Sequence, residues 1–379
     1  MVLDAICIQW IYMNFLKNSI WLLLSLPVSA SLFCKKSNKN IEPAGAVEIR
    51  DSVIAGNLSH PWEILWGPDN HIWMTERGGK ISRLNPLTGT ITPVLIINEV
   101  ESNGEGGMLG MALHPSFAST PQLFVVYNYD NGSGYKEKVV RYNYNGTTLT
   151  NPLIIIDNIQ AAGIHNGSRL LIVGDKLFIS TGDASNQSHP QNVSSVNGKI
   201  LRLNLDGTVP ADNPVPGNSY WSFGHRNPQG LVSANNKLYS SEHGPSNDDE
   251  INIIEKGKNY GWPNVHGFCD EPGERDFCND HQAVEPIKAW TPTIATCGLD
   301  YYNSDLIPQW KNSLLLVALK NARLYQLKLN EAFSSVSVTN EYFAGKYGRM
   351  RDLCISPAGK VYICTSNGSN DKIIEVTKK

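Results

Sequence analysis

The chain has 379 residues, of which 41% are hydrophobic and 18% charged, with 32 glycines and 21 prolines. This composition is typical of a globular protein and excludes a disordered one. The formal net charge of -3 leaves no basic surface of the kind that nucleic acid binding requires, so no nucleic acid partner is expected. The length suits one large all-β domain or two smaller ones.

The N-terminal residues have the features of an export signal. A short basic segment containing Lys17 precedes the apolar run from Ile20 to Leu26, and the small residues of Val28-Ser29-Ala30 suit a cleavage site. We expect residues 1–30 to be a signal peptide, 31–45 a polar linker and 46–379 the folded domain. The run is short for a spanning helix, so no membrane span is expected. The predicted location is periplasmic or secreted.

Cys34 leaves a second form of export open. It precedes Lys35-Lys36, as a lipid-bearing cysteine at a mature N-terminus would. Small residues are expected just before such a cysteine, and Ser31-Leu32-Phe33 fits this poorly. A lipid anchor at Cys34 and a free secreted chain therefore both remain as hypotheses.

Export also makes disulfides possible, because the compartments outside the cytosol are oxidising. Cys269 and Cys278 bracket a loop and are candidates to pair. Cys354 and Cys364 flank a Pro-Ala-Gly-Lys turn and are candidates to face each other across a hairpin. Spacing alone does not determine connectivity, so both pairings stay open. No CxxC motif is present, which disfavours a zinc site.

One pattern recurs along the chain: a turn containing Gly, Asn or Pro, followed by a strand rich in apolar and aromatic residues. No long segment has the 3.6-residue apolar period of a helix. Units of this length predict an all-β fold, a six-bladed β-propeller, closed by the N-terminal strand 46–50 beside 372–376. The strands after these turns are 71–75, 123–127, 177–181, 238–241, 314–318 and 361–365.

The stretch Gly244-Pro245-Ser246-Asn247-Asp248-Asp249-Glu250-Ile251-Asn252 offers many oxygen atoms within a few residues. Calcium prefers six to eight oxygen ligands from carboxylates, amides and backbone carbonyls. Taken alone, the stretch is more simply an acidic surface turn. Other loops of the predicted ring favour the calcium site over the surface turn.

Those loops carry cations and a histidine. His165 lies just before a blade, Arg226 follows a histidine in Gly-His-Arg-Asn-Pro, and Lys320 follows a fully apolar strand. Arg349 and Arg351 are two residues apart and lie on the same side of an extended chain. Each signal is weak alone, but a propeller brings such loops to one end of its channel. Because guanidinium groups match carboxylates, the combination predicts an anionic, polycarboxylate ligand with a divalent cation.

Five motifs occur together in a fixed order, and with them the chain resembles the glucose/sorbosone dehydrogenase family from about Leu58 to about Glu375. These soluble aldose sugar dehydrogenases use pyrroloquinoline quinone (PQQ) and have a six-bladed β-propeller fold. The motifs are Gly-Glu-Gly-Gly-Met-Leu-Gly, His-Asn-Gly-Ser-Arg-Leu, Gly-His-Arg-Asn-Pro-Gln-Gly, Glu-His-Gly-Pro with Asp-Asp-Glu-Ile-Asn, and Asn-Tyr-Gly-Trp-Pro.

The resemblance implies a role for individual residues. His165 matches the general base that takes the proton of the anomeric hydroxyl, and Arg226 matches the residue beside the quinone carbonyl. Gly244 and Pro245 match carbonyl donors to the calcium ion that bridges protein and PQQ. Residues matched to a second, structural calcium site are Glu250, Tyr260 and Asp270. Residues matched to PQQ contacts or active-site polar positions are Glu105, Asp183, Asn227, Thr293, Lys320, Arg349 and Arg351.

The implied function is PQQ- and calcium-dependent oxidation of an aldose at its anomeric carbon to a lactone, with electrons passed to an external acceptor. The family's best-known glucose-oxidising member has an acidic residue just before the catalytic histidine. This chain has Ile164, which puts its sugar specificity in question. Two alternatives remain: a non-catalytic propeller that binds carbohydrate or protein, and a calcium-dependent lactonase-type hydrolase.

Overall fold

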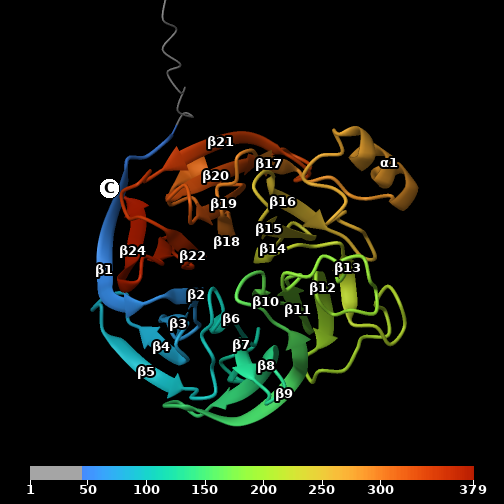
Figure 1. The fold of residues 1–379 in the computed structure, drawn as a ribbon. Coiled ribbons are helices and arrows are strands. Elements are labelled where there is room, and N and C mark those ends of the chain that lie inside the picture. The colour runs from blue at the N-terminus through green and yellow to red at the C-terminus, as the bar shows by residue number, and fades with distance from the viewer. Residues whose placement is uncertain (1–44) are drawn as a thin grey trace, which may run out of the picture. The chain divides into compact units, whose positions relative to one another are not determined.

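The computed structural model describes residues 45–379. The expected signal peptide, the linker up to residue 44 and Cys34 lie outside the described residues. Six antiparallel sheets of four strands form a ring around a central axis (Figure 1). The prediction of a six-bladed β-propeller is therefore confirmed. Within the described part of the chain, no helix combines the length and apolar character needed to cross a bilayer.

Each blade takes its strands in chain order from the axis outward, and only the last blade borrows a strand from the N-terminal side. Blade 1 comprises β2 (Pro61–Trp66), β3 (Ile72–Glu76), β4 (Lys80–Leu84) and β5 (Ile91–Ile96); blade 2 comprises β6 (Met108–Leu113), β7 (Gln122–Asp130), β8 (Tyr135–Tyr144) and β9 (Leu149–Gln160); blade 3 comprises β10 (Gly167–Val173), β11 (Lys176–Thr181), β12 (Lys199–Asn204) and β13 (Tyr220–Phe223); blade 4 comprises β14 (Pro228–Ala234), β15 (Lys237–Glu242), β16 (Asp249–Ile254) and β17 (Lys288–Trp290); blade 5 comprises β18 (Thr296–Tyr302), β19 (Ser313–Ala318), β20 (Arg323–Leu329) and β21 (Val336–Tyr342); and blade 6 comprises β22 (Met350–Ile355), β23 (Val361–Thr365), β24 (Ser369–Lys378) and β1 (Ile49–Ser59).

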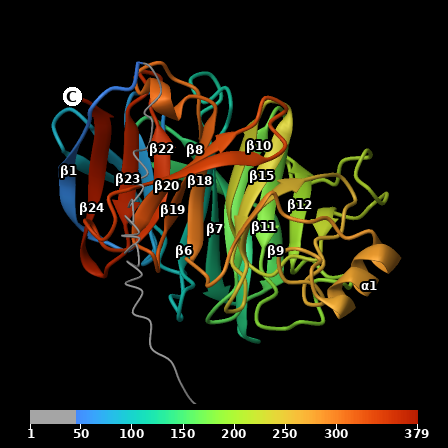
Figure 2. The ribbon, with the colours of Figure 1, turned by 90° about the horizontal axis from the view of Figure 1, so that it is seen from above.

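The ring closes where β1 pairs antiparallel with β24, with Asp51 opposite Val376. The expected closing partner is thus correct, but the strand starts at Ile49 instead of Ala46 and extends to Ser59. The longer pairing gives blade 6 its outermost strand from the opposite end of the described chain. The two strands lie side by side in both views (Figures 1 and 2).

The turn-and-strand pattern found in the sequence marks the second strand of every blade: β3, β7, β11, β15, β19 and β23. These strands are buried on both faces because each blade is packed between two neighbours. In β19 all of the residues Ser313–Ala318 are buried. The apolar side chains form six core clusters, one between each successive pair of blades. Burial between blades is therefore what holds the ring together.

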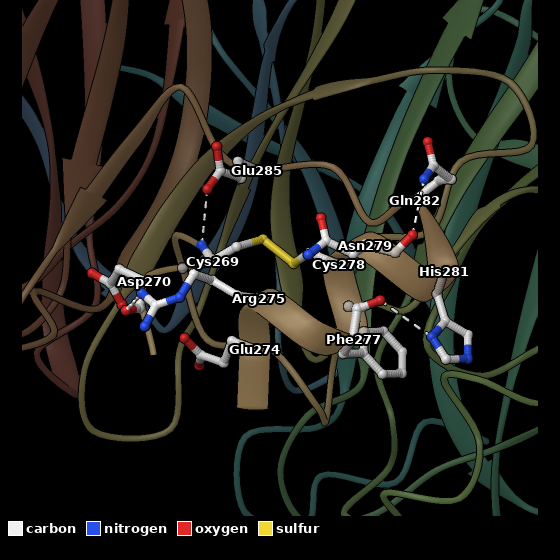
Figure 3. The surroundings of a disulfide bond; sticks show 12 residues. Cys269, Asp270, Glu274, Arg275, Phe277, Cys278, Asn279, His281, Gln282 and Glu285 are labelled. Atoms are coloured by element: carbon white, nitrogen blue, oxygen red, sulfur yellow. Dashed lines mark hydrogen bonds between the residues drawn. A yellow bond between two sulfur atoms is a disulfide. The ribbon is translucent and has the colours of Figure 1, made fainter. Parts of the chain in front are cut away.

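One excursion leaves the ring between β16 and β17. It contains helix α1 (Pro272–His281), none of whose residues is buried, and it projects outward beside blade 4 (Figure 1). Cys269 and Cys278 form a disulfide across its first turns, as Figure 3 shows, so this candidate pairing is confirmed. A capping box between Glu271 and Glu274 also stabilises the helix start.

The other candidate pairing is wrong. Ile355 pairs with Val361 across the turn, which places Cys354 opposite Tyr362 and Cys364 opposite Asp352. The two thiols are thus offset along the hairpin instead of facing each other, and both are free and buried. Burial raises the pKa of both thiols well above the ordinary value, so they are inert side chains of the core.

Candidate active site

Most of the predicted site residues lie at one end of the propeller axis. The innermost strands β2, β6, β10, β14, β18 and β22 begin at this end, and the second strands of the blades finish there, as in the pairing of Pro228 with Glu242. Loops that enter the first strands and leave the second strands therefore meet around the axis. We call this end the cup. His165, Arg226, Asn227, Thr293, Arg349 and Glu105 precede innermost strands, and Asp183, Gly244, Pro245 and Lys320 follow second strands.

His165 and Asp183 contact each other within the cup. Nδ1 of His165 lies 2.9 Å from Oδ1 of Asp183, and the imidazole remains 16% exposed while the carboxylate is 2% exposed. Backbone Ser185 also donates to Oδ1, and Nε1 of Trp262 donates to Oδ2 at 2.9 Å. His165 has a left-handed φ of 61°, which only local contacts can sustain in a residue with a side chain. One such contact is the bond from Ala184 N to the His165 carbonyl.

Arg226 packs against the same tryptophan. Its guanidinium carbon is 5.2 Å from the ring centroid of Trp262, and Nη1 donates to the carbonyl of His243. Its carbonyl accepts a bond from Asp183 N, so the backbones of the histidine's partner and the arginine are joined directly. Burial lowers the pKa of Arg226, and the carboxylates of Asp183 and Glu242 oppose that shift, so the side chain is a fixed cation.

Glu242, the last residue of β15, holds the arginine loop in place. Its Oε1 accepts bonds from the backbone N–H groups of Arg226 and Asn227, and its Oε2 lies 2.9 Å from Nδ1 of His225. Nε2 of that histidine contacts the hydroxyl of Ser222 at 2.8 Å. Glu242 begins the Glu-His-Gly-Pro motif, but the sequence does not indicate its role, because its partners lie in a separate loop, at residues 225–227.

The remaining predicted cofactor residues are a lysine–threonine pair in blade 5 and two arginines in blade 6. Lys320 and Thr293 meet, with Nζ 3.2 Å from Oγ1, although they lie in separate loops of blade 5. Arg351 is 5% exposed and its Nη1 donates to Gln229 at 2.8 Å, whereas Arg349 is exposed at the rim. Three buried donors in the cup have no hydrogen-bond partner among the described residues: Nε of Arg226, Nε of Arg351 and Nδ2 of Asn227.

Arg77 is a further cation that the sequence analysis did not identify. It directly follows β3, whereas Lys320 is the second residue after β19, so the two cations do not occupy equivalent positions in their blades. Its guanidinium donates to the carbonyls of Gly104 and Gly106 and so holds the loop that carries Glu105. The N–H of Glu105 in turn donates to Gly163 O, next to the histidine loop.

The predicted calcium loop surrounds a small cavity. Gly244, Pro245, Glu250 and Tyr260 line it together with Glu242. Burial, followed by the charge of Glu242, raises the pKa of Glu250 to about 8. Two buried carboxylates so close to each other fit a site for a cation. The described residues contain no group of three or more His, Cys, Asp or Glu arranged for a metal, so backbone carbonyls would have to complete the ligand set.

Asp270, matched to the second calcium site, and Asp249, part of the oxygen-rich stretch, do not line this cavity. Asp270 is exposed in the loop before α1 and is not among the residues that line the cavity. Asp249, part of the oxygen-rich stretch, uses Oδ1 to accept a bond from Gly244 N and Oδ2 to accept bonds from Ile294 N and Ala295 N. Asp249 therefore holds the backbone at Gly244 next to the backbone at Ile294 and Ala295, and it does not line the cavity.

The family model described as Glucose / Sorbosone dehydrogenase matches residues 58–375. The chain belongs to this family. Quinoprotein glucose dehydrogenase B of Acinetobacter calcoaceticus is 31% identical, over 91% of this chain and 89% of that protein. Aldose sugar dehydrogenase YliI of Escherichia coli K12 is 30% identical, over 94% and 97%. The PQQ-bound aldose sugar dehydrogenase of Streptomyces coelicolor has a TM-score of 0.76 at 29% identity, covering 88% of this chain and 99% of that one.

Proposed function

We propose that this member of the glucose/sorbosone dehydrogenase family oxidises aldose sugars at the anomeric carbon to lactones, with PQQ and calcium as cofactors. Family membership makes the chain an oxidoreductase of the sugar dehydrogenase class. The observation that carries the proposal is the cup itself. One histidine, paired with a buried carboxylate, shares a single end of the ring with four of the basic side chains predicted from the sequence and one more, Arg77.

The residues present fit such a cofactor. PQQ is a tricarboxylate with carbonyl groups, so most of its polar atoms are hydrogen-bond acceptors and it suits a site rich in donors. The unpartnered donors of Arg226, Arg351 and Asn227 supply this match, and Lys320 and Arg349 add charge at the rim. We assign the cofactor contacts to Glu105, Asp183, Asn227, Thr293, Lys320, Arg349 and Arg351. The bound quinone supplies two-electron oxidation, and calcium held by the carbonyls of Gly244 and Pro245 acts as a Lewis acid.

His165 has the position that a general base requires. With Nδ1 protonated and donating to Asp183, its Nε2 carries a lone pair, and no hydrogen bond from the described residues occupies that atom. The buried carboxylate fixes the tautomer and stabilises the imidazolium that forms when a proton arrives. His165 thus accepts the proton of the anomeric hydroxyl, and Arg226 stabilises negative charge that develops opposite it.

The test is an assay of dye reduction. Purified protein is mixed with PQQ, calcium and an artificial electron acceptor, and a panel of aldoses is added. Dye reduction that requires both cofactors supports the proposal, and its absence with every sugar overturns it. The same protein is offered lactones without PQQ, because hydrolysis there would identify the lactonase-type alternative. Binding of sugars without either reaction would identify a non-catalytic propeller.

We also propose export to the periplasm or beyond the cell, where an external electron acceptor would be met. The features that support this are the signal-like residues 1–30 and the disulfide between Cys269 and Cys278, which forms in oxidising compartments. Fractionation of cells that express the full chain, with and without mutation of Cys34, distinguishes a free protein from a lipid-anchored one.

A further inference from the structure

The loop between β11 and β12, residues 184–198, lies beside the cup. It begins directly after Asp183, the carboxylate that contacts the proposed base, and it ends where β12 begins. The middle of this β11–β12 loop meets the loop of Arg226, because Gly224 N donates to Pro190 O at 3.1 Å. The β11–β12 loop therefore joins the residue that orients the base to the segment that carries the arginine. None of the site residues predicted from the sequence lies in it.

Lys199, the first residue of β12, holds the β11–β12 loop in one shape. Its Nζ donates to the carbonyls of His189, Pro190 and Asn197, at 2.9, 3.0 and 2.8 Å. The lysine is 0% exposed, and these three acceptors match the three N–H donors of its ammonium group. Burial of an amine is costly without such partners. Because the carbonyls come from the middle and the end of the loop, Lys199 fixes the position of the middle part, which includes Gln191.

Gln191 uses its side-chain amide to hold the neighbouring segment. It forms a reciprocal pair with Asn259, in which Nε2 of Gln191 donates to Oδ1 at 3.0 Å and Oε1 accepts a bond from Nδ2 at 2.9 Å. The same Nε2 donates to the carbonyl of Trp262 at 2.7 Å. The N–H of Trp262 donates to Gly224 O, whereas its carbonyl has no other hydrogen bond from the described residues. Gln191 is therefore the only described side chain that fixes the tryptophan carbonyl.

Trp262 connects this amide pair to the proposed reaction. It is 6% exposed, its Nε1 donates to Oδ2 of Asp183 at 2.9 Å, and the guanidinium of Arg226 lies over its ring. The direction of the indole N–H depends on where the backbone of the tryptophan is held. A hydrogen bond weakens steeply as its angle departs from linear, and small errors in the placement of catalytic groups reduce turnover. Loss of the bond to the Trp262 carbonyl should therefore disturb the carboxylate that orients His165.

We propose that Gln191 is a positioning residue for the pair of His165 and Asp183, and that Lys199 keeps it in place. Gln191 fixes the backbone of Trp262, the indole fixes the carboxylate, and the carboxylate orients the imidazole. The inference rests on the proposed role of His165 as general base. Both N–H donors of Gln191 are used within the protein, so we expect it to affect the rate of proton removal more than the binding of the sugar.

A double-mutant cycle tests the route through the tryptophan. Gln191→Ala should lower kcat for dye reduction about tenfold and change the KM for the sugar by less than about twofold. In Trp262→Phe, which already lacks the bond to Asp183, the same substitution should change kcat by less than about twofold. Asn192→Ala is the control in the same loop and should keep the wild-type kcat, because this exposed side chain accepts its only hydrogen bond among the described residues from Ser194 N. Unchanged kcat in Gln191→Ala, or an equal loss in both backgrounds, overturns the inference.

The indole signal of Trp262 tests the same inference without turnover. Protein grown with isotope-labelled tryptophan gives one indole N–H signal per tryptophan in an NMR spectrum, and the signal missing in Trp262→Phe identifies the residue. In the cofactor-free protein, Gln191→Ala should move this signal, whereas Asn192→Ala should not. The signals of Trp62 and Trp310, which lie in other blades, are the internal controls and should stay in place.

Gln191→Glu keeps the size and the acceptor of the side chain and removes only the donor, so it replaces the alanine variant if a thermal melt shows that variant to be unfolded. It should move the same indole signal. An unmoved signal in a folded Gln191 variant contradicts the inference. Absence of dye reduction in the wild type would instead overturn the proposed function, and the indole signal would still decide whether Gln191 positions Trp262.

Discussion

Oδ2 of Asp183 accepts a bond from Nε1 of Trp262 while Oδ1 of the same carboxylate lies 2.9 Å from Nδ1 of His165. The tryptophan therefore fixes the carboxylate from one side, and the carboxylate fixes the imidazole from the other. Arg226 stacks on the same indole ring, so the proposed base and the proposed electrophilic cation are aligned by one rigid side chain.

Removing the imidazole should abolish most turnover while leaving the cofactor site intact. We expect His165→Ala to lower kcat by about 10²–10⁴-fold, the usual contribution of general-base catalysis, with PQQ binding retained. The rate of dye reduction gives kcat, and a titration with PQQ followed by absorbance gives the affinity for the cofactor. Turnover within a few-fold of the wild type would refute the role of His165.

Asp183→Asn tests the tautomer argument. Asparagine keeps the shape but can present an N–H to Nδ1, which favours the wrong imidazole tautomer and removes the charge that stabilises the imidazolium. We expect kcat to fall by about 10²-fold or more and KM to change little. Trp262→Phe is a milder comparison, because it removes only the bond to Oδ2. A loss confined to KM would contradict the proposed function of the pair.

Glu242→Gln should act through the backbone of the arginine loop. The neutral amide retains an oxygen acceptor but loses the charge that attracts the N–H groups of Arg226 and Asn227. We expect weaker PQQ binding and a lower kcat, each by about tenfold, because a charge-assisted bond contributes more than a neutral one. Ser222→Ala, at the far end of the same chain of contacts, is the control and should have a smaller effect. Equal effects of the two substitutions would contradict a positioning role for the charge.

Calcium should stabilise the protein without PQQ. A ligand that binds only the folded state at about 100 times its Kd adds about 2.7 kcal/mol to the free energy of unfolding. Thermal melts with calcium and with a chelator should differ, and Glu250→Gln should lose that difference because its side chain lines the small cavity. Asp270→Asn should retain most of it, since Asp270 lies apart. Identical melts with and without chelator for the wild type would remove both calcium assignments.

The titration of Glu137 should make the free energy of unfolding depend on pH. This glutamate on β8 accepts a bond from Ser168 at Oε2, and its buried Oε1 has no partner among the described residues. Burial raises its pKa from the ordinary 4.5 to about 8. The folded state thus retains a proton that the unfolded chain has released. The contribution of Glu137 to the free energy of unfolding is therefore full below pH 4.5 and is lost as the pH rises to about 8.

The variant Glu137→Gln cannot titrate at this position, so comparing it with the wild type isolates the effect of Glu137. Relative to the wild type, the variant should gain stability as pH rises through this window, by at most about 1.4 kcal/mol per pH unit. Urea unfolding at several pH values checks the difference. A constant difference between the two proteins across the window would show that Glu137 does not titrate there.

The repeat in the sequence was enough to predict the fold and much of the site, for a physical reason. A propeller brings the same kind of loop from every blade to one end, so counting six apolar strands also places His165, Arg226, Lys320 and Arg351 at the cup. The meeting of Thr293 with Lys320 follows from the same rule. The placement of His165, Arg226, Lys320 and Arg351 required only periodicity and the direction of the chain, whereas Thr293 was indicated only by the family resemblance.

Contacts that depend on strand register could not be predicted from the sequence. Cys354 and Cys364 seemed to face each other, but the pairing of Ile355 with Val361 offsets them. Asp249 resembled a metal ligand in the sequence, yet its carboxylate is occupied by backbone N–H groups. Arg77 shows no local pattern at all, because its partners are carbonyls in the next blade. Composition cannot distinguish an oxygen that binds a cation from one that binds an amide.

The pairing of β1 with β24 has a practical consequence for engineering. Because the first and last strands of the described ring share one blade, they could be joined by a short linker and the chain reopened in a connection between two other blades, apart from the connections that carry His165 and Arg226. Such a circular permutant would keep all six sheets and leave the loops around His165 and Arg226 uncut. It would also move the attachment point for a fused electron-transfer domain or an electrode tether from blade 6 to whichever side of the ring is wanted.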